Sequence, residues 1–191
     1  VEIVGVCDTS GPLTDVLTKY SGFECFSDYL QMIRKVKPVA VFVSVPTRMH
    51  SAIIRVLIEE KIHIFSEKPF CLNPEEGAPL LDLVKQSNLI NQVGYHNKFV
   101  GTFQEVKRII DSGLIGDIYH FQAEAYGPVV IKKKQGTWRS NPEEGGGCLM
   151  DYASHVVDLL NYLIAPVSEV YSSIVKSVYS ANVDDAVYAL L

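Results

Sequence analysis

The stretch PVAVFVSVPTRMHSAIIRVLIEEKIHIFSEKP, residues 38–69, carries the pattern that decides the fold. Residues 38–46 form a run that is apolar except for Ser44, which is typical of a strand that is buried on both faces. Thr47 predicts the cap of a following helix, and residues 62–69 repeat the strand pattern. The apolar face of the intervening helix consists of Ile53, Ile54, Leu57 and Ile58. A strand, a helix and a second strand in this order indicate a parallel βαβ unit.

The same alternation of strand and helix extends over residues 1–97. Residues 2–7 predict a buried strand that ends at Asp8, and residues 89–97 predict another strand. Three further helices are predicted: over residues 13–20, after a cap at Ser27, and after a cap at Asn73 that precedes Pro74 and a capping-box Glu76. Pro79 lies inside the last helix, where a proline predicts a kink or a later start. The whole pattern favours a parallel sheet with helices on both faces.

The pattern changes after Asn97. A helix is predicted over about residues 102–111, and residues 117–127 alternate between apolar and polar in the manner of a half-buried strand. Two more strands are predicted, over 168–178 and 185–191. Residues 98–191 are therefore predicted to form an α+β domain with a largely antiparallel open sheet, following an α/β domain of residues 1–97.

Composition restricts the classes of protein that the chain can belong to. Of its 191 residues, 48% are hydrophobic and 20% are charged, so a sizeable core and one to two domains are expected. The formal net charge is -5 and the basic run 132–134 is isolated, so nucleic acid is not expected as a partner. A membrane partner is not expected either, because no window reaches about 18 consecutive apolar residues.

Cysteine usage and the open sheet add two expectations. The four cysteines, Cys7, Cys25, Cys71 and Cys148, are widely spaced and form no CxxC pair, which argues against a zinc site. They are typical of free thiols in a reducing compartment, so a cytoplasmic location is expected. An open antiparallel sheet exposes unpaired edges, which favours a homo-oligomer.

Polar residues of one predicted helix form a candidate site. In GGGCLMDYASHVVDLLNYL, residues 145–163, the spacing of four and three places Asp151, His155 and Asp158 on the same helix face. One interpretation makes His155 an acid–base group that Asp151 orients. A polar stripe facing solvent is an alternative, and a metal site for hydrolysis is another.

Two charged residues follow predicted strands. Lys68 stands at the end of a strand, where open parallel sheets bind their ligands, and Pro69 favours an extended backbone at that lysine. Asp8 also follows a strand, at a position where a carboxylate can accept hydrogen bonds from a ribose 2′-OH. A surface lysine and a turn aspartate are the structural alternatives.

In combination, these motifs resemble one family: the glucose-fructose oxidoreductase, inositol dehydrogenase and MocA-like oxidoreductases. The matching segments follow one another in the family's order: VGVCD, VFVSVPTRMH, FSEKPF, GYHNKF, IDSGLIGDI, TWRSNPEEGGGCLMDYASHVVDLL and VDDAVYALL. The resemblance implies a Rossmann-type first domain and a small-molecule substrate. The implied reaction transfers a hydride between a nicotinamide cofactor and a hydroxyl or carbonyl carbon of a sugar, polyol or related compound.

The resemblance also implies roles for individual residues. Lys68 would bind the reacting oxygen, His155 would exchange its proton, and Asp151 would support both. The cofactor would contact Asp8, Ser44, Val45, Pro46, Thr47, His50, Glu67 and Lys68. The substrate would contact His96, Asn97, Tyr126, Trp138 and Arg139. Asp8 favours NAD, with NADP as the alternative cofactor.

The sequence departs from the family pattern at one important point. No GxGxxG motif precedes Asp8, so the first domain is expected to be incomplete at its N-terminus. In the doubly wound order 3-2-1-4-5-6 the missing strand would be the central one. We expect the natural protein to contain about 20 to 35 further N-terminal residues, roughly a strand with its glycine-rich turn, and a continuation of the second domain.

Two other functions are compatible with the same motifs. A non-catalytic regulator that senses a bound nucleotide could use this fold, and so could an enzyme that cleaves glycosidic bonds with a bound nicotinamide. Turnover separates these possibilities: a regulator would bind cofactor without reaction, and a glycosidase would show no net oxidation of its substrate.

Overall fold

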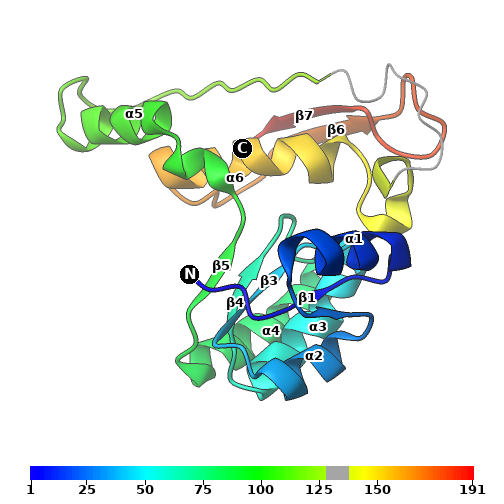
Figure 1. Ribbon diagram of the computed structural model, residues 1–191. Coiled ribbons are helices and arrows are strands. Elements are labelled where there is room, and N and C mark those ends of the chain that lie inside the picture. The colour runs from blue at the N-terminus through cyan, green and yellow to red at the C-terminus, as the bar shows by residue number, and fades with distance from the viewer. Residues whose placement is uncertain (128–137) are drawn as a thin grey trace.

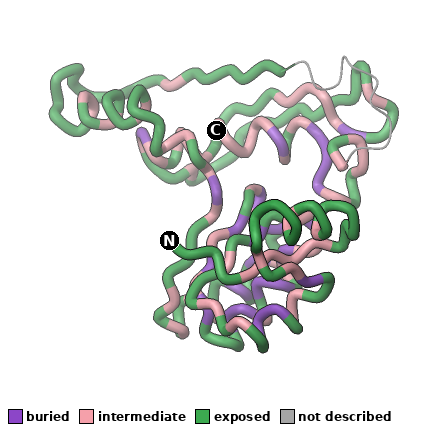
Figure 2. The backbone as a smooth tube through the Cα atoms, viewed as in Figure 1, coloured by how far each residue is buried: buried purple, intermediate pink, exposed green. Residues whose placement is uncertain are grey.

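The computed structural model describes residues 1–127 and 138–191, so the basic run 132–134 falls outside the described residues. Figure 1 shows an N-terminal part built on parallel strands and a C-terminal part built on helices and an antiparallel strand pair. Buried residues concentrate in the N-terminal part, as the tube in Figure 2 shows. These two parts agree with the predicted order of an α/β unit followed by an α+β unit.

The stretch of residues 38–69 forms the predicted βαβ unit. Strands β3 (Ala40–Val43), β4 (His63–Ser66) and β5 (Asn91–Val93) make a three-stranded parallel sheet in the order β3-β4-β5. Helices α3 (His50–Glu59) and α4 (Pro74–Ser87) connect these strands and pack against each other. Ile54, Leu57 and Leu80 are almost wholly buried at this contact, so apolar burial organises this region.

The first strands form a separate sheet. Strand β1 (Val6–Cys7) pairs in parallel with β2 (Cys25–Phe26), flanked by α1 (Gly11–Ser21) and α2 (Tyr29–Val36). The predicted strand over 2–7 is therefore shorter, and residues 1–4 are exposed. In the described residues β1 and β3 are not paired, so the parallel strands form two sheets.

Helix caps corrected two of the predicted starts. Asp28, rather than Ser27, caps α2, because its carboxylate accepts the Leu30 N–H at 2.8 Å. Thr47 does not cap α3: it begins the 3₁₀ turn η1 (Thr47–Met49), and the α-helix follows from residue 50. Its side chain is buried instead of capping the helix.

The predicted cap of α4 is confirmed. The Asn73 side chain accepts the Glu76 N–H at 2.9 Å, and Pro74 occupies the first helical turn, where its missing N–H has no intrahelical partner to lose. Of the two expectations for Pro79, a kink or a later start, the later start is wrong, because α4 runs from residue 74 to 87 with that proline inside it.

The C-terminal part begins with the 3₁₀ turn η2 (His96–Phe99) and helix α5 (Gly101–Asp111). Two short turns, η3 (Trp138–Ser140) and η4 (Pro142–Glu144), precede the π-helical turn η5 (Leu149–Ala153) and helix α6 (Ser154–Leu163). Strands β6 (Ser172–Lys176) and β7 (Ala186–Leu190) pair antiparallel, which confirms that prediction. None of the described helices has the length and apolar character of a membrane span.

The strand predicted over residues 117–127 is wrong. This segment is extended but not a strand, and nearly all of its side chains are exposed. Figure 1 shows it running along the top of the molecule, and none of its residues pairs with β6 or β7. Alternating polarity alone does not make a strand, because strand stability comes from the pairing with a neighbour.

Candidate active site

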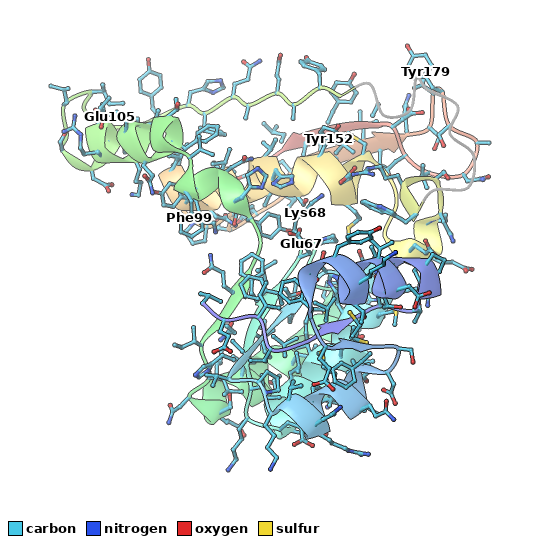
Figure 3. The ribbon with its side chains drawn as sticks, in the orientation of Figure 1. Glu67, Lys68, Phe99, Glu105, Tyr152 and Tyr179 are labelled. Atoms are coloured by element: carbon cyan, nitrogen blue, oxygen red, sulfur yellow. The ribbon has the colours of Figure 1, made fainter. Side chains whose placement is uncertain are left out.

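Lys68 joins the two parts of the chain. It lies two residues beyond the end of β4, and its Nζ donates to Asp151 Oδ1 at 2.6 Å and to the Asp151 carbonyl oxygen at 3.1 Å. Both side chains are largely buried, with 16% and 9% of their surface exposed. Figure 3 shows Lys68 in the space between the parallel strands and the helix that carries Tyr152. A strand end and a helix start far apart in sequence therefore share one ion pair.

Arg139 supplies a second cation to Asp151. Its Nε donates to Asp151 Oδ2 at 2.9 Å, while its guanidinium stacks over the Trp138 ring at 4.4 Å. Burial raises the pKa of Asp151, but hydrogen bonds and charge from Lys68 and Arg139 outweigh burial, so the net shift of this pKa is downward. Asp151 is therefore a carboxylate at neutral pH, and each of its oxygens faces a cation.

His155 lies one turn further along the same helical segment. Its ring packs edge-on against Tyr95 and His96, with centroid distances of 5.6 and 5.4 Å. Burial lowers the pKa of His155, the charges of Lys68 and His96 lower it further, and Asp151 and Asp158 act in the opposite direction. The net shift is downward, so the imidazole is neutral at pH 7 and able to accept a proton.

The two carboxylates of the predicted polar helix face pair with lysines that follow two different strands. Asp151 pairs with Lys68, which follows β4, and Asp158 pairs with Lys98, which follows β5, at 2.7 Å. Over residues 1–127 and 138–191 no group of three histidine, cysteine or acidic side chains is arranged to hold a metal ion. Asp151 pairs with Lys68 and Arg139, and Asp158 pairs with Lys98. This arrangement gives no support to metal-assisted hydrolysis.

Three glycines allow the helical segment to begin close to its neighbours. A Cβ on Gly145 (φ +83°) would lie 3.0 Å from Thr47 Oγ1, and a Cβ on Gly146 would lie 2.5 Å from the Arg139 carbonyl oxygen. Gly147 (φ +108°) leaves no room for a side chain beside Asp184. The carboxylate of Asp184 accepts the Leu149 N–H at 2.6 Å, which fixes the start of η5.

The segment that was predicted as one α-helix begins as a π-helix. Residues 149–153 form η5, and only residues 154–163 are α-helical. A π-turn is wider than an α-turn, so residues four apart still share a face, and such turns are frequent at functional sites. Asp151 lies in the wide turn and His155 in the first turn of α6.

Comparison with known proteins decides the family. Residues 1–95 match the family model described as "Oxidoreductase family, NAD-binding Rossmann fold", and residues 103–191 match "GFO/IDH/MocA C-terminal domain". The chain belongs to the GFO/IDH/MocA oxidoreductase family. The resemblance inferred from the sequence motifs is therefore confirmed.

Relatives of this GFO/IDH/MocA chain include sugar and polyol dehydrogenases. D-glucoside 3-dehydrogenase of Escherichia coli is 27% identical, over 86% of this chain and 47% of the relative. The NAD⁺-dependent scyllo-inositol 2-dehydrogenase of Bacillus subtilis is 31% identical, over 65% of this chain and 35% of the relative. The chain thus spans less than half the length of these two relatives.

A solved structure confirms the architecture of the GFO/IDH/MocA chain. The WlbA dehydrogenase of Bordetella pertussis, in complex with NADH and UDP-GlcNAcA, superposes with a TM-score of 0.84 at 26% identity. The match covers 98% of this chain and 55% of that protein. A Rossmann-type parallel domain followed by a domain with an antiparallel sheet is therefore the fold of this chain.

The predicted cofactor residues have different surroundings in the structure. Asp8 follows β1 and its Oδ1 accepts the Ser10 N–H at 2.7 Å. Glu67 is exposed beside Lys68, and its carboxylate accepts the Lys68 N–H at 3.2 Å. Ser44, Val45, Pro46 and Thr47 follow β3 at the same sheet edge. Thr47 alone among these four is buried, beneath Gly145.

His50 requires a correction. Its side chain is buried, with Nδ1 3.0 Å from the Pro69 carbonyl oxygen and Nε2 3.0 Å from the Val45 carbonyl oxygen. Both ring nitrogens are occupied by the backbone, so His50 holds the loops after β3 and β4 together rather than facing a ligand. The predicted cofactor contact is replaced by this structural position.

The predicted substrate residues divide into two groups. His96, Trp138 and Arg139 belong to the cluster around Asp151 and His155, and Asn97 is half-buried in the same η2 turn as His96. Tyr126 does not join them: its side chain is exposed and its hydroxyl donates to Glu124 at 2.9 Å.

Sequence reasoning missed four residues that organise the site. Lys98 and Tyr95 lie within the motif GYHNKF, and Asp184 lies within VDDAVYALL, but none was singled out. Arg48 was missed as well; its Nε lies 3.5 Å from Glu144 Oε1, which ties η1 to η4. Asp184 lies 35 positions after the helix start that it stabilises, so no local sequence signal pointed to it.

Proposed function

We propose that the whole protein is an NAD(P)-dependent oxidoreductase that transfers a hydride between nicotinamide and a hydroxyl or carbonyl carbon of a sugar, polyol or related small molecule. The observation that carries the proposal is the cluster of Lys68, Asp151 and His155 beyond the carboxyl end of β4. In open parallel sheets this edge is where ligands bind. The names of the relatives support the substrate class, since they include glucoside and inositol dehydrogenases.

The chemistry assigns each side chain a task. The ammonium of Lys68 binds the reacting oxygen and stabilises negative charge as it develops there. His155, neutral at pH 7, accepts the hydroxyl proton during oxidation and returns it during reduction. Asp151, paired with Lys68 and Arg139, holds the lysine amine in place and keeps it charged. When bound, the nicotinamide accepts or supplies the hydride.

The donor set fits such a cofactor. Asp8, at the carboxyl end of β1, would accept hydrogen bonds from the ribose hydroxyls, which favours NAD over NADP. Ser44, Val45, Pro46 and Thr47 would line the cofactor side of the cleft, and Glu67 would border it next to Lys68. Substrate would be contacted by His96, Asn97, Trp138 and Arg139.

Three further properties belong to the proposal. We assign residues 1–97 to the cofactor domain and 98–191 to the substrate domain. A cytoplasmic location is supported by the four unpaired cysteines.

A homo-oligomer is supported by large apolar side chains exposed on β6 and β7, Ile174, Tyr188 and Leu190 among them, which a second copy of the chain would cover. Light scattering of the whole protein tests this last property.

The test is hydride transfer by the whole protein, followed by nicotinamide absorbance over a panel of sugars and polyols with each cofactor. Lys68→Ala and His155→Ala are each expected to lower kcat/KM by about 100-fold or more, since each removes a group that stabilises or transfers charge in the transition state. The control is Lys107→Ala, which removes a partly exposed amine on α5 that pairs with Asp111. Unchanged turnover in both site variants would refute the assigned roles.

Two other results would replace the proposal. Cofactor binding with no turnover on any substrate would indicate a cofactor-sensing regulator. Cleavage of a glycoside with no net change in nicotinamide absorbance would indicate a glycosidase that uses NAD.

A further inference from the structure

Two polar atoms on one side of α6 are buried and have no hydrogen-bond partner among the described residues: Nδ1 of His155 and Oδ2 of Asp158. The two residues are three positions apart in a continuous α-helix, so their side chains lie on the same face, one turn apart. Buried polar groups are nearly always paired, so two unpaired atoms on residues one helical turn apart require an explanation.

The two atoms have complementary chemistry. A neutral imidazole carries one N–H and one acceptor nitrogen, whereas a carboxylate only accepts. If the proton is on Nδ1, a buried donor without an acceptor stands beside a buried acceptor without a donor. One contact between them, made directly or through a single water molecule, removes both deficits.

We propose that Asp158 is the positioning residue of His155, accepting a hydrogen bond from Nδ1–H directly or through one water molecule. The inference rests on the proposed function of His155 as the proton acceptor. A proton fixed on Nδ1 leaves Nε2 as the basic nitrogen, which is the tautomer that proton abstraction requires. Lys98 holds the other oxygen of Asp158 at 2.7 Å and so fixes the carboxylate.

Charged and titratable groups from four segments contact His155 or shift its pKa. Lys68 comes from the segment after β4, Asp151 from η5, Asp158 from α6 itself, and Tyr95 and His96 from the segment after β5. Lys98 and Arg139 act on His155 through its neighbours: Lys98 pairs with Asp158, and Arg139 pairs with Asp151. Of these groups, Asp151 and Asp158 raise the pKa of His155, while Lys68 and His96 lower it.

A purely structural role for Asp158 predicts something different. The Asp158–Lys98 ion pair ties α6 to η2, and if this were its whole purpose, removing either partner would displace the helix in the same way. The positioning role predicts opposite effects on the pKa of His155. Without Asp158 the imidazolium loses a stabilising charge; without Lys98 the charge of Asp158 is no longer compensated.

The experiment measures the pH dependence of kcat in the direction of oxidation, in the whole protein. Asp158→Asn is expected to lower kcat by about 100-fold with little change in KM, because the amide NH₂ can donate to Nδ1 and so favours the tautomer with its proton on Nε2. The acidic limb of the kcat–pH profile of Asp158→Asn should move to lower pH. Lys98→Met should move that limb to higher pH. Asp111→Asn, which removes an exposed ion pair on α5, is the control and should change neither.

A second measurement needs no turnover. Long-range ¹H–¹⁵N correlation spectra of the His155 ring report both its tautomer and its pKa, with the proton expected on Nδ1 in the native protein and on Nε2 in Asp158→Asn. Limbs that move in the same direction in both variants, or an unchanged tautomer in Asp158→Asn, would overturn the inference. If Asp158→Asn fails to fold, an upward shift in Lys98→Met supports the inference and an unchanged limb contradicts it. A native protein with no turnover would refute the proposed function, while the spectra still test the Asp158 contact.

Discussion

The β3-α3-β4 region and the η5–α6 region are held together by different forces. In the first, Ile54, Leu57 and Leu80 exclude water almost completely, and apolar contact dominates. In the second, Leu163 is the one buried apolar side chain of α6, whereas Asp151 and His155 are surrounded by charges and rings. Apolar contacts in the core region carry no charge, so we expect its stability to depend less on pH. The site region depends on charges and on partners far along the chain. Substitutions in the first should cost stability, and substitutions in the second should cost activity.

The largest stability effect is expected in the core. Leu57→Ala removes a side chain with no exposed surface and leaves a cavity, so the free energy of unfolding should fall by about 3 kcal/mol. Urea unfolding of the whole protein measures the loss. Leu81→Ala on α4 is the matched control, because Leu81 is 49% exposed and its removal should cost less than about 1 kcal/mol. Equal losses in the two variants would mean that this contact is not the core of the domain.

The difference between the two regions also explains what the sequence could predict. Apolar runs and helical spacing are local, so residues 38–69 predicted β3, α3 and β4 with their order and direction. The two-residue strand β2 was missed because so short a strand has no periodicity to detect. The alternation over 117–127 was misleading, since a pattern specifies which face is apolar and not whether a partner strand is present.

The candidate site was predicted in part. Lys68, Asp151 and His155 were found because a strand end, a helical stripe and the family motifs all pointed to them. The Lys98–Asp158 pair joins residues 60 positions apart, and Asp184 acts on a helix start 35 positions before it. Such contacts depend on how distant segments of the C-terminal part pack together, and no local pattern of one sequence contains that information. The same reason explains His50, for which the family resemblance implied a cofactor contact although both ring nitrogens face carbonyl oxygens.

An intermediate effect is expected at the start of the site helix. Gly147→Ala places a side chain at φ +108° and against Asp184, so it should lower the free energy of unfolding by about 2 kcal/mol and also reduce kcat, because η5 carries Asp151. Gly113→Ala is the matched control, because Gly113 has a φ of +70° but open space around the Cβ position. This substitution strains the backbone without displacing a neighbouring residue. A loss of kcat in both variants, or in neither, would contradict the role assigned to this close approach.

The smallest effect distinguishes the two regions by pH. The pKa of His155 is lower in the folded protein than the value of 6.5 that applies when it is unfolded, chiefly because of burial. Below 6.5 the unfolded chain binds a proton that the folded chain does not, so stability falls as the pH drops from 6.5 towards the folded pKa. His155→Gln should remove this part of the pH dependence, whereas the loss caused by Leu57→Ala should be the same at either pH. Urea unfolding of the native protein and both variants at about pH 7.5 and about pH 5.5, on either side of the ordinary histidine pKa, measures the difference. An identical pH dependence in the native protein and His155→Gln would show that this imidazole titrates as freely when folded as when unfolded, and the proton acceptor would then have to be sought elsewhere.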